Sequence, residues 1–446
     1  MLFGTDGVRG IANVELTPEL AFRVGRAAAA VLAGGGRPRF AVGRDTRLSG
    51  HLLQSALVAG MLSAGADVLD LGVITTPGVA YLTRHLGCQG GAVVSASHNP
   101  AEYNGIKLIS AEGYKFPDEV EEKIEALVLG ADSLPRPAGS GVGRLEDARA
   151  ARGQYIEYLV GTVPGALPAL PVVVDCANGA TADLAPQVLG RVGARVTAIN
   201  VEPDGLNINA GCGSTHPQGL AREVVERGAQ AGVAHDGDGD RTIAVDEKGQ
   251  VVDGDAIMGI LARALQREGR LRGGAVVGTV MSNLGLEVFL RQAGLGLVRT
   301  PVGDRYVLEE MLRGGYSLGG EQSGHIIFLD HATTGDGMLT ALQLLWALAR
   351  SGESLSALAG RIPRYPQVLR NVRLPNGMRY RPTPRIEEAL REAREALGER
   401  GRVLVRPSGT EPLVRIMVEG VDGEEVARAA GMLEEVIAGE LLNSTA

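Results

Sequence analysis

An apolar strand, a polar loop, a helix, a small-residue turn and a second strand follow one another three times in this 446-residue chain. The copies occupy residues 40–71, 172–201 and 276–298. Two strands joined by a helix through short glycine turns pair in parallel, so each copy predicts a βαβ unit. The domain-sized spacing predicts three related α/β domains. Unrelated βαβ units share this pattern, so duplication of one ancestral domain stays a hypothesis beside that simpler explanation.

The C-terminal part of the chain has a different pattern. Its apolar periodicity predicts a helix at residues 384–397, strands at 403–405 and 414–418, and a final helix at 424–442. Strands and helices in this order, without the βαβ repeat, indicate a smaller α+β domain.

Linkers are expected where glycine, proline and charged residues collect, at residues 130–153, 253–255 and 363–366. Asp255 is expected to be the N-cap of the helix that follows the second linker. A chain of this length holds about three or four domains. The expected domains are residues 1–150, 151–253, 254–365 and 366–446.

The composition argues against several classes of function. Hydrophobic residues make up 45% and charged residues 22% of the chain, as in a soluble globular protein. The net charge of −8 and the absence of a Lys/Arg block argue against nucleic acid as a partner. We expect neither a signal peptide nor a transmembrane helix, and hence no membrane partner. Three cysteines without metal-site spacing argue against a disulfide framework, so a cytoplasmic location is expected.

A serine-containing loop, residues 95–100 (SASHNP), follows the apolar run at 91–94. A serine hydroxyl at the end of a buried strand, on a proline-bounded loop, is well placed for nucleophilic chemistry. His98 lies in the loop, and Lys107 follows what the Asn104-Gly105 pair indicates is a turn. The loop is therefore a candidate catalytic site.

Three aspartates, Asp236, Asp238 and Asp240, alternate with glycines. At strand spacing, alternate carboxylates point the same way, and three like charges repel unless a cation neutralises them. Oxygen ligands favour Mg²⁺ or Ca²⁺, and three carboxylates suit Mg²⁺. An EF-hand is the alternative, with Glu247 at its twelfth position. Its sixth position, however, is Arg241 instead of glycine, and the following residues predict a strand.

Three further segments are candidates on weaker grounds. Residues 406–412 (RPSGTEP) offer a guanidinium, hydroxyls and exposed backbone N–H groups to a phosphate, with Arg415 close by in sequence. Residues 320–325 (GEQSGH) offer a carboxylate and a hydroxyl to sugar hydroxyls or an amine, and a histidine that titrates near neutral pH. Residues 4–10 (GTDGVRG) follow no strand and do not form a dinucleotide loop. Each is otherwise an ordinary polar loop.

Taken together, these motifs resemble the α-D-phosphohexomutase superfamily over the whole length of the chain. The serine loop, DGDGDR, GEQSGH and RPSGTEP occur in the order of the family's four signature loops, and the GTDGVRG start and the glutamine of GEQSGH resemble its glucosamine branch. The resemblance implies three related α/β domains with mixed sheets plus a smaller C-terminal α+β domain around a central cleft. It also implies that each domain supplies one loop.

The resemblance also implies roles for individual residues. Ser97, which directly precedes His-Asn-Pro, is expected to be a phosphoserine, with His98 as a hydrogen-bonding neighbour. One Mg²⁺ is expected between the phosphoserine and Asp236, Asp238 and Asp240. Arg9 and Lys107 are expected near the proton transfers. The expected substrate ligands are Arg241, Glu321, Ser323, His325, Arg406, Ser408, Gly409, Thr410 and Arg415. His235, directly before the aspartates, is unusual, and its role is open between tuning the metal site and none.

The implied reaction converts D-glucosamine 6-phosphate into D-glucosamine 1-phosphate for the synthesis of UDP-N-acetylglucosamine and the cell wall. It is expected to pass through glucosamine 1,6-bisphosphate, which also serves as activator. The partner is a small phosphosugar, and a homodimer is an open alternative to a monomer. Rival readings are a mutase for mannose or glucose phosphates, a metal-dependent phosphatase with a serine nucleophile, and a protein that only binds phosphosugars or calcium.

Overall fold

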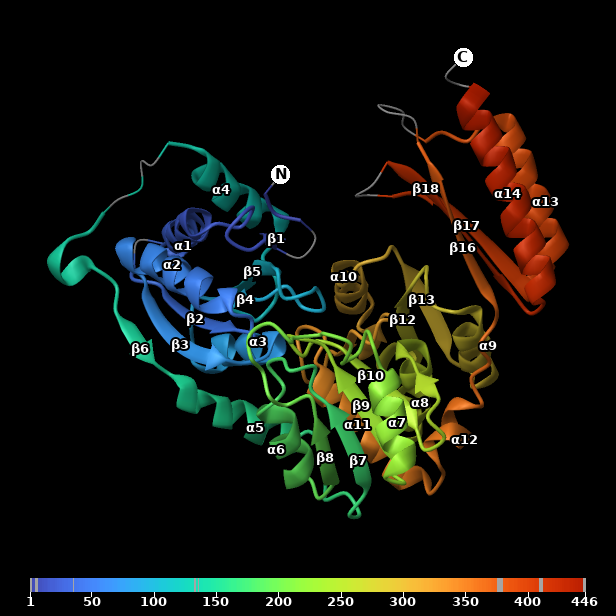
Figure 1. Ribbon diagram of the computed structural model, residues 1–446, viewed down its shortest axis with the longest axis horizontal. Coiled ribbons are helices and arrows are strands. Elements are labelled where there is room, and N and C mark those ends of the chain that lie inside the picture. The colour runs from blue at the N-terminus through green and yellow to red at the C-terminus, as the bar shows by residue number, and fades with distance from the viewer. Residues whose placement is uncertain are drawn as a thin grey trace. The chain divides into compact units, whose positions relative to one another are not determined.

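The computed structural model describes residues 2–4, 7–34, 36–131, 134, 136–374, 380–408 and 412–443. The chain forms two compact units (Figure 1). The first comprises Met1–Met281 and Leu295–Gly360, and the second comprises Ser282–Gly294 and Arg361–Ala446. Within the described residues, no helix is both long and apolar enough to cross a membrane.

The first sheet has the strand order β1-β5-β4-β2-β3-β6. Strand β5 runs antiparallel to both of its neighbours, whereas β4, β2, β3 and β6 are parallel, so the sheet is mixed. The strands are β1 (Val8–Ile11), β2 (Arg39–Arg44), β3 (Asp67–Val73), β4 (Gly90–Val94), β5 (Tyr103–Ser110) and β6 (Leu145–Asp147). The helices are α1 (Pro18–Leu32), α2 (Ser49–Ser63), α3 (Thr76–His85) and α4 (Asp118–Leu129).

Helices α1, α2 and α4 share a core with β2, β4 and β5. Two glycines let α1 and α2 approach closely. A Cβ on Gly25 would lie 2.1 Å from the Leu57 carbonyl oxygen, and one on Gly60 would lie 2.1 Å from the Phe22 carbonyl oxygen. Any larger residue there would force the two helices apart.

The second sheet has the order β11-β10-β9-β7-β8 and the third has the order β13-β12-β14-β15. The strands of the second are β7 (Pro171–Asp175), β8 (Arg195–Ile199), β9 (Ala231–His235), β10 (Thr242–Asp246) and β11 (Val251–Val252), with helices α5 (Arg152–Val160), α6 (Leu184–Arg191) and α7 (Gln218–Glu226). The strands of the third are β12 (Ala275–Thr279), β13 (Gly296–Thr300), β14 (Leu318–Gly320) and β15 (Ile326–Phe328), with helices α8 (Gly254–Arg267), α10 (Asp304–Gly314), α11 (Gly337–Ser351) and α12 (Leu355–Ala359).

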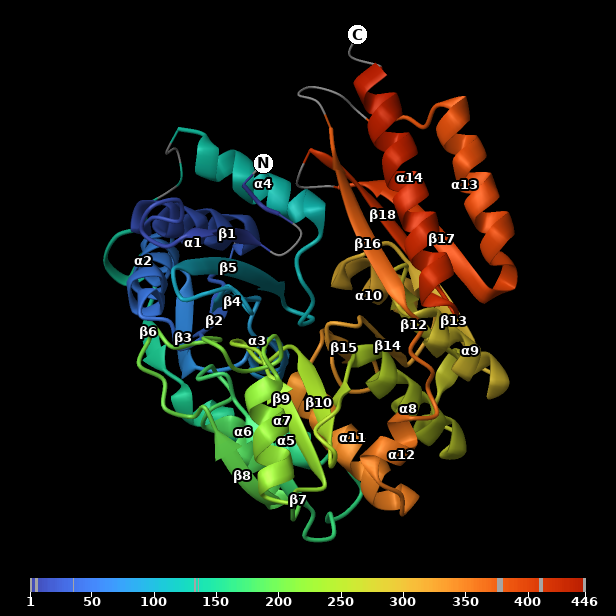
Figure 2. The ribbon, with the colours of Figure 1, turned by 45° about the vertical axis from the view of Figure 1, so that its right-hand side comes forward.

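The second unit is built on an antiparallel sheet of order β16-β18-β17. Its strands are β16 (Gln367–Arg373), β17 (Gly401–Pro407) and β18 (Leu413–Gly420), and its helices are α9 (Leu284–Gln292), α13 (Pro384–Leu397) and α14 (Gly423–Asn443). Helices α13 and α14 lie side by side on one face of the sheet (Figure 2). They share one apolar core with it.

The three predicted βαβ units are confirmed, because β2–β3, β7–β8 and β12–β13 are parallel pairs with a helix between them in the chain. The smaller α+β domain is confirmed as well, although the sequence analysis missed β16. Two local expectations are wrong. The linker at 130–153 contains β6, and the N-cap of α8 is Asp253, whose side chain accepts a hydrogen bond from the Ala256 N–H, instead of Asp255. The boundaries of the four domains stay a prediction.

Candidate active site

The serine loop connects β4 to β5, and its backbone is held from behind by one buried arginine. The Arg47 guanidinium, 0% exposed, donates hydrogen bonds to the carbonyl oxygens of Ser97 (3.0 Å), Asn99 (2.8 Å) and Tyr103 (3.0 Å). Its charge is balanced by Asp45, 2.8 Å away. A planar fork with several fixed donors can hold a whole loop in this way, which a lysine cannot do.

The two serines of the loop have different surroundings. Ser95 donates its hydroxyl to Asp45 (2.6 Å) and accepts the Ser97 N–H (3.0 Å), so its side chain supports the loop. Ser97 has a φ of +51°, a left-handed conformation that costs a non-glycine residue about 1–3 kcal/mol. The Asn209 side chain also donates to the Ser97 carbonyl oxygen (2.9 Å). With its backbone fixed in this way, Ser97 presents its hydroxyl to Asp236 at 2.6 Å.

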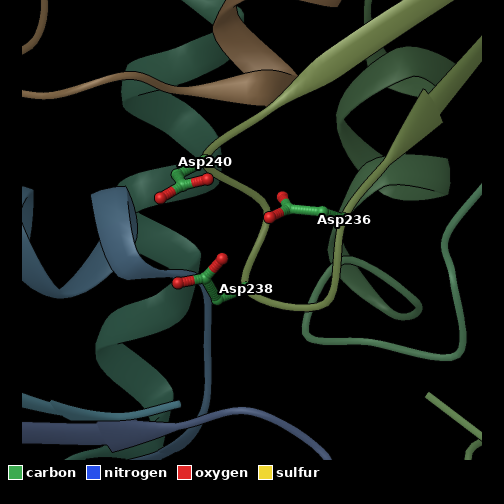
Figure 3. A group of neighbouring side chains, drawn as sticks. All are labelled: Asp236, Asp238 and Asp240. Atoms are coloured by element: carbon green, nitrogen blue, oxygen red, sulfur yellow. The ribbon is translucent and has the colours of Figure 1, made fainter. Parts of the chain in front are cut away.

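The aspartate loop, residues 236–240, is a turn between β9 and β10 and not part of a strand, so the expected strand spacing is wrong. The carboxylates still converge, because Gly239 takes a φ of +71° and folds the chain back. One oxygen of each of Asp236, Asp238 and Asp240 lies within 4.8 Å of the others (Figure 3). The expected cluster is therefore present, for a different geometrical reason.

Residues of the first sheet and its helices complete this cluster. Lys107 Nζ lies 2.9 Å from Asp238 Oδ2 and 3.5 Å from Asp240 Oδ2. Thr76, in the first turn of α3, donates its hydroxyl to Asp238 Oδ2 (2.6 Å) and its N–H to the Asp238 carbonyl oxygen (2.9 Å). The cluster thus draws side chains from two sheets that are far apart in sequence.

The electrostatics of the cluster favour a bound divalent cation. Burial, together with the charges of Asp240 and Asp238, holds the pKa of Asp236 well above its ordinary value. Oδ1 of Asp240 is buried and has no hydrogen-bond partner among the described residues. Three close carboxylates with oxygen atoms left for coordination fit a hard ion such as Mg²⁺. Lys107 and Arg241, whose Nε lies 3.9 Å from Asp240 Oδ1, supply two positive charges against three negative ones.

His98 lies next to the serine, Lys107 contacts the aspartate cluster, and Arg9 is close enough to His98 to lower its pKa. Their catalytic roles stay predictions, and one local prediction is wrong. Residues 104 and 105 belong to β5 and do not form a turn, so Lys107 is a strand residue opposite Val93 of β4. Arg9 is a strand residue too, on β1 opposite Gly105. The His98 ring nitrogen Nδ1 lies 3.4 Å from Ser97 Oγ. Burial and the charges of Arg241 and Arg9 lower the pKa of His98 to about 4, so its ring is neutral at neutral pH.

The GEQSGH segment connects β14 to β15, and a bridge between Arg241 and His325 joins it to the aspartate loop. Glu321 accepts the Gly303 N–H at 3.1 Å. The Ser323 hydroxyl and both ring nitrogens of His325 are buried without a hydrogen-bond partner among the described residues. Buried polar groups are nearly always paired, so these atoms indicate a polar ligand.

In the second unit, Arg406 and Arg415 lie opposite each other on β17 and β18. Burial and the charge of Arg415 lower the pKa of Arg406, and a bound anion would relieve that repulsion. The Ser408 N–H donates to the Leu413 carbonyl oxygen (2.8 Å). Gly409 and Thr410, two of the predicted phosphate ligands, lie outside the described residues.

Sequence reasoning missed three residues of the site: Arg47, Thr76 and Asn209. Each donates a hydrogen bond to a residue about 50 to 160 positions away in sequence, and none belongs to a recognisable motif. Of the three, only Arg47 could have been suspected from the sequence, because it closely follows the strand predicted at residues 40–45, where loop residues of α/β domains often form sites. A pairing at such a distance needs the fold before it can be seen.

Four family models match the chain: "Phosphoglucomutase/phosphomannomutase, alpha/beta/alpha domain I" over residues 1–134, the corresponding domain II over 154–249, domain III over 253–365, and the C-terminal domain over 369–436. Among curated relatives, a phosphoglucosamine mutase of Moorella thermoacetica is 58% identical and covers 98% of this chain and 99% of its own. One from Symbiobacterium thermophilum is 56% identical over 99% of both chains.

Two solved structures show the same fold over nearly the whole chain. A phosphoglucomutase/phosphomannomutase family protein of Burkholderia thailandensis has a TM-score of 0.81 at 26% identity, over 98% of this chain and 97% of its own. The N-acetylphosphoglucosamine mutase of Aspergillus fumigatus, solved in complex with GlcNAc-6P and magnesium, has a TM-score of 0.70 over 98% and 96%. At 17% identity, the second likeness concerns the fold alone.

Proposed function

The chain belongs to the phosphoglucomutase/phosphomannomutase family, and we propose that it converts D-glucosamine 6-phosphate into D-glucosamine 1-phosphate. Relatives that are 52–58% identical over nearly the full chain are named phosphoglucosamine mutase. A mannose or glucose phosphate mutase, the alternative within the family, is not favoured by these names. The enzyme is accordingly an isomerase that works by phosphoryl transfer.

One observation supports the chemistry most directly: the Ser97 hydroxyl lies 2.6 Å from Asp236 of the aspartate cluster, and Lys107 contacts Asp238 of the same cluster at 2.9 Å. A hydroxyl in this position can carry a phosphate that a divalent cation and an ammonium group then neutralise. An ordinary serine nucleophile would need a base. His98 lies 3.4 Å from the hydroxyl, but its pKa of about 4 makes it a weak base, so we assign it the role of a hydrogen-bonding neighbour.

We propose Ser97 as the phosphate carrier. In the first half-reaction the bond between Ser97 Oγ and phosphorus breaks and a bond from the sugar O1 to phosphorus forms. The O1 proton passes to a nearby base, and the departing Ser97 oxygen takes up a proton. The resulting glucosamine 1,6-bisphosphate turns over, and the phosphoryl group on O6 then returns to Ser97. Lys107 and Arg9 supply positive charge and handle the hydroxyl proton in this proposal.

Mg²⁺ would be held by Asp236, Asp238, Asp240 and an oxygen of the phosphate on Ser97. When bound, it would offset the negative charge of the transferring phosphoryl group. Lys107 holds Asp238 and Asp240 together through contacts of 2.9 and 3.5 Å, which keeps their oxygens gathered for the ion.

The remaining candidates divide between the sugar and its second phosphate. The buried, unpartnered atoms of Ser323 and His325, with Glu321 and Arg241 beside them, support a sugar-binding role. The paired guanidinium groups of Arg406 and Arg415 support binding of the phosphate that does not react. Ser408, Gly409 and Thr410 are proposed to donate to the same phosphate. A cytoplasmic location and a homodimer also stay predictions.

A coupled assay tests the proposal. Purified protein with Mg²⁺ and a trace of glucosamine 1,6-bisphosphate should convert glucosamine 6-phosphate faster than glucose 1-phosphate. Ser97→Ala should abolish both turnover and the phosphoprotein signal, because no other hydroxyl lies at this position. Ser110→Ala, at the far end of β5, is the matched control and should change neither. Turnover by the Ser97→Ala protein would refute the phosphate-carrier role.

A further inference from the structure

A cavity of about 250 Å³ opens beside His325 in the first unit. One wall comes from the segment between β5 and α4, including Lys115 and Phe116, and the other comes from α10, including Asp304 and Leu308. The proposed mechanism gives Lys115 and Asp304 no role. Their charges, placed next to a sugar-binding candidate, therefore need an explanation.

The Asp304 carboxylate lies between an ammonium group and an imidazole. Its Oδ2 is 2.6 Å from Lys115 Nζ and 3.7 Å from His325 Nε2. Both members of the ion pair remain in contact with solvent, with side-chain exposures of 27% for Lys115 and 22% for Asp304. A pair that is this accessible can exchange partners at low cost, unlike the fully buried pair of Arg47 and Asp45.

The backbone holds Asp304 next to the GEQSGH segment. Gly303, directly before it, has φ and ψ of +133° and +133°, a conformation that strongly favours glycine. In that conformation the Gly303 N–H donates to Glu321 Oε1 at 3.1 Å. Asp304 thereby faces the same region as His325, which is 4% exposed and whose two ring nitrogens have no hydrogen-bond partner among the described residues. Those unpartnered nitrogens indicate that a polar ligand occupies this region.

Glucosamine phosphate differs from glucose phosphate only at C2, where an amine replaces a hydroxyl. A protonated amine carries a positive charge and three donors, so its natural partner is a carboxylate. The three metal-site aspartates already have Lys107 and the proposed ion as partners. Glu321 accepts the Gly303 N–H, and its charge is offset by that of Arg241. These four carboxylates are therefore less suited to bind the amine.

Two carboxylates, Asp304 and Glu309, line the cavity together with His325. Glu309 accepts a hydrogen bond from the Arg305 guanidinium on its own helix (2.8 Å), whereas Asp304 Oδ2 lies 3.7 Å from the His325 ring, so Asp304 is the better candidate.

We propose that Asp304 binds the protonated 2-amino group of the substrate, which takes the place of the Lys115 ammonium group. The inference rests on the proposed function, whose substrate class it deepens. The exchange replaces one ammonium by another, so the charge on Asp304 stays compensated. A neutral hydroxyl at C2 offers no such replacement, and the site discriminates against glucose phosphates on that ground.

Asp304→Asn tests the proposal, with kcat/KM measured for glucosamine 6-phosphate and for glucose 6-phosphate. A hydrogen bond to a charged group is typically strong enough that its loss should reduce the glucosamine-to-glucose ratio about 10- to 100-fold. Glu310→Gln, on the same helix and paired with Arg313, is the matched control and should leave the ratio unchanged. An equal loss for both sugars, or no loss, would overturn the proposal.

Lys115→Met separates substrate recognition from a purely structural clamp. Removal of the exchanging ammonium should lower, or at least not raise, the KM for glucosamine 6-phosphate and preserve the preference for it. A clamp between the two cavity walls predicts instead that Lys115→Met impairs both sugars, as Asp304→Asn would then do as well, and this result would refute the proposal. Wild-type protein that isomerised glucose phosphates but not glucosamine phosphates would refute the proposed function itself.

Binding can also be measured without turnover. In a Ser97→Ala background, calorimetric titration with glucosamine 6-phosphate and glucose 6-phosphate should show the preference for the amine. Adding Asp304→Asn should remove that preference, whereas adding Glu310→Gln should not. A preference that survives the loss of the Asp304 charge would place amine recognition elsewhere.

Discussion

Arg47 fixes much of the backbone conformation around the reactive Ser97. Its guanidinium group donates to four carbonyl oxygens, those of Ser97, Asn99, Pro100 and Tyr103, and pairs with the fully buried Asp45. Together with the bonds from Asn209 and to Ser95, these contacts offset the strain of the left-handed conformation of Ser97. The position of the Ser97 hydroxyl therefore depends on a side chain that does not touch it.

Arg47→Lys should lower kcat at least tenfold and leave the KM for substrate nearly unchanged. Lysine keeps the charge next to Asp45 but loses the fork that holds the loop. Steady-state kinetics and denaturant unfolding measure the two effects. Arg37→Lys is the control, because Arg37 also donates to Asp67 and two carbonyl groups, but at an exposed position. A kcat equal to that of the wild type would show that the loop holds its shape without the fork.

At the residue scale, the sequence predicted the chemistry better than the geometry. The aspartate cluster, Ser97 and Lys107 were recognised by residue type, and all lie together. The aspartates converge through a turn and not through a strand, and Asn104-Gly105 lies in a strand and not in a turn. The propensity of a pair such as Asn-Gly is local, and pairing with β4 and β1 overrides it.

At the scale of elements, α11 supports the aspartate loop from behind. Its first residue, Gly337, donates its N–H to the Gly239 carbonyl oxygen (2.9 Å) and accepts the Thr242 hydroxyl at its own carbonyl oxygen (2.7 Å). The Thr242 hydroxyl has one proton, so His235 Nδ1, at 2.8 Å, must be the donor in their contact. Burial lowers the pKa of His235 to about 4, so the ring is neutral at neutral pH with its proton on Nδ1, and we infer that it positions the loop.

Thr242→Val should destabilise the protein by about 1–3 kcal/mol, because the Gly337 carbonyl and the His235 ring then lose their partner in a buried site. The same change should weaken Mg²⁺ activation, which a loss of stability alone would not do. Urea unfolding and the Mg²⁺ dependence of the rate measure the two effects. Thr340→Val, which removes a bond to the carbonyl oxygen of Asp336 at the N-cap of α11, is the control. Unaltered Mg²⁺ activation would confine Thr242 to a structural role.

A second buried polar group ties α9 to the C-terminal sheet. Glu419 is 0% exposed and accepts hydrogen bonds from the Leu284 N–H (3.0 Å), Gln367 (3.1 Å) and Asn283 (3.3 Å), and also from Arg402. These bonds give a physical reason why residues 282–294 belong to the second unit. The linker predicted at 363–366 lies close to Arg361, where the longer stretch of this unit begins, but its composition could not show that an earlier helix joins the unit.

Glu419→Ala should destabilise the second unit by about 3–5 kcal/mol, because it leaves the half-buried Arg402 guanidinium and several further donors uncompensated. Hydrogen exchange of amides in β16, β17 and β18 reports on this unit specifically. Glu434→Ala is the control, because its pair with Arg370 is exposed and should contribute no more than about 1 kcal/mol. Equal protection of these amides in both variants would contradict the structural role of Glu419.

At the scale of the whole molecule, the division into βαβ units and a final α+β domain followed from periodicity, because that signal is local. The aspartate cluster depends on contacts that periodicity does not encode. Ser97 and Lys107 come from the first sheet, and the aspartates from the second. Sequence order alone therefore indicated a set of four loops, and the resemblance to a known family was needed to expect them together.

The same arrangement predicts that a divalent cation stabilises the folded chain. Binding to the native state alone adds RT ln(1 + [Mg²⁺]/Kd), about 2.7 kcal/mol at 100 times Kd, which should raise the Tm by a few degrees relative to EDTA. Asp238→Asn removes one of the proposed metal ligands, so the Tm of this variant should no longer respond to Mg²⁺. The same change relieves the repulsion that raises the pKa of Asp236, which offsets part of the stability lost without metal. Asp246→Asn, a buried aspartate on β10 that accepts the N–H groups of Lys248 and Gln250, is the control and should keep the response at a lower Tm. Differential scanning calorimetry with and without Mg²⁺ measures all three proteins, and a full Mg²⁺ shift in Asp238→Asn would place the ion outside the aspartate cluster.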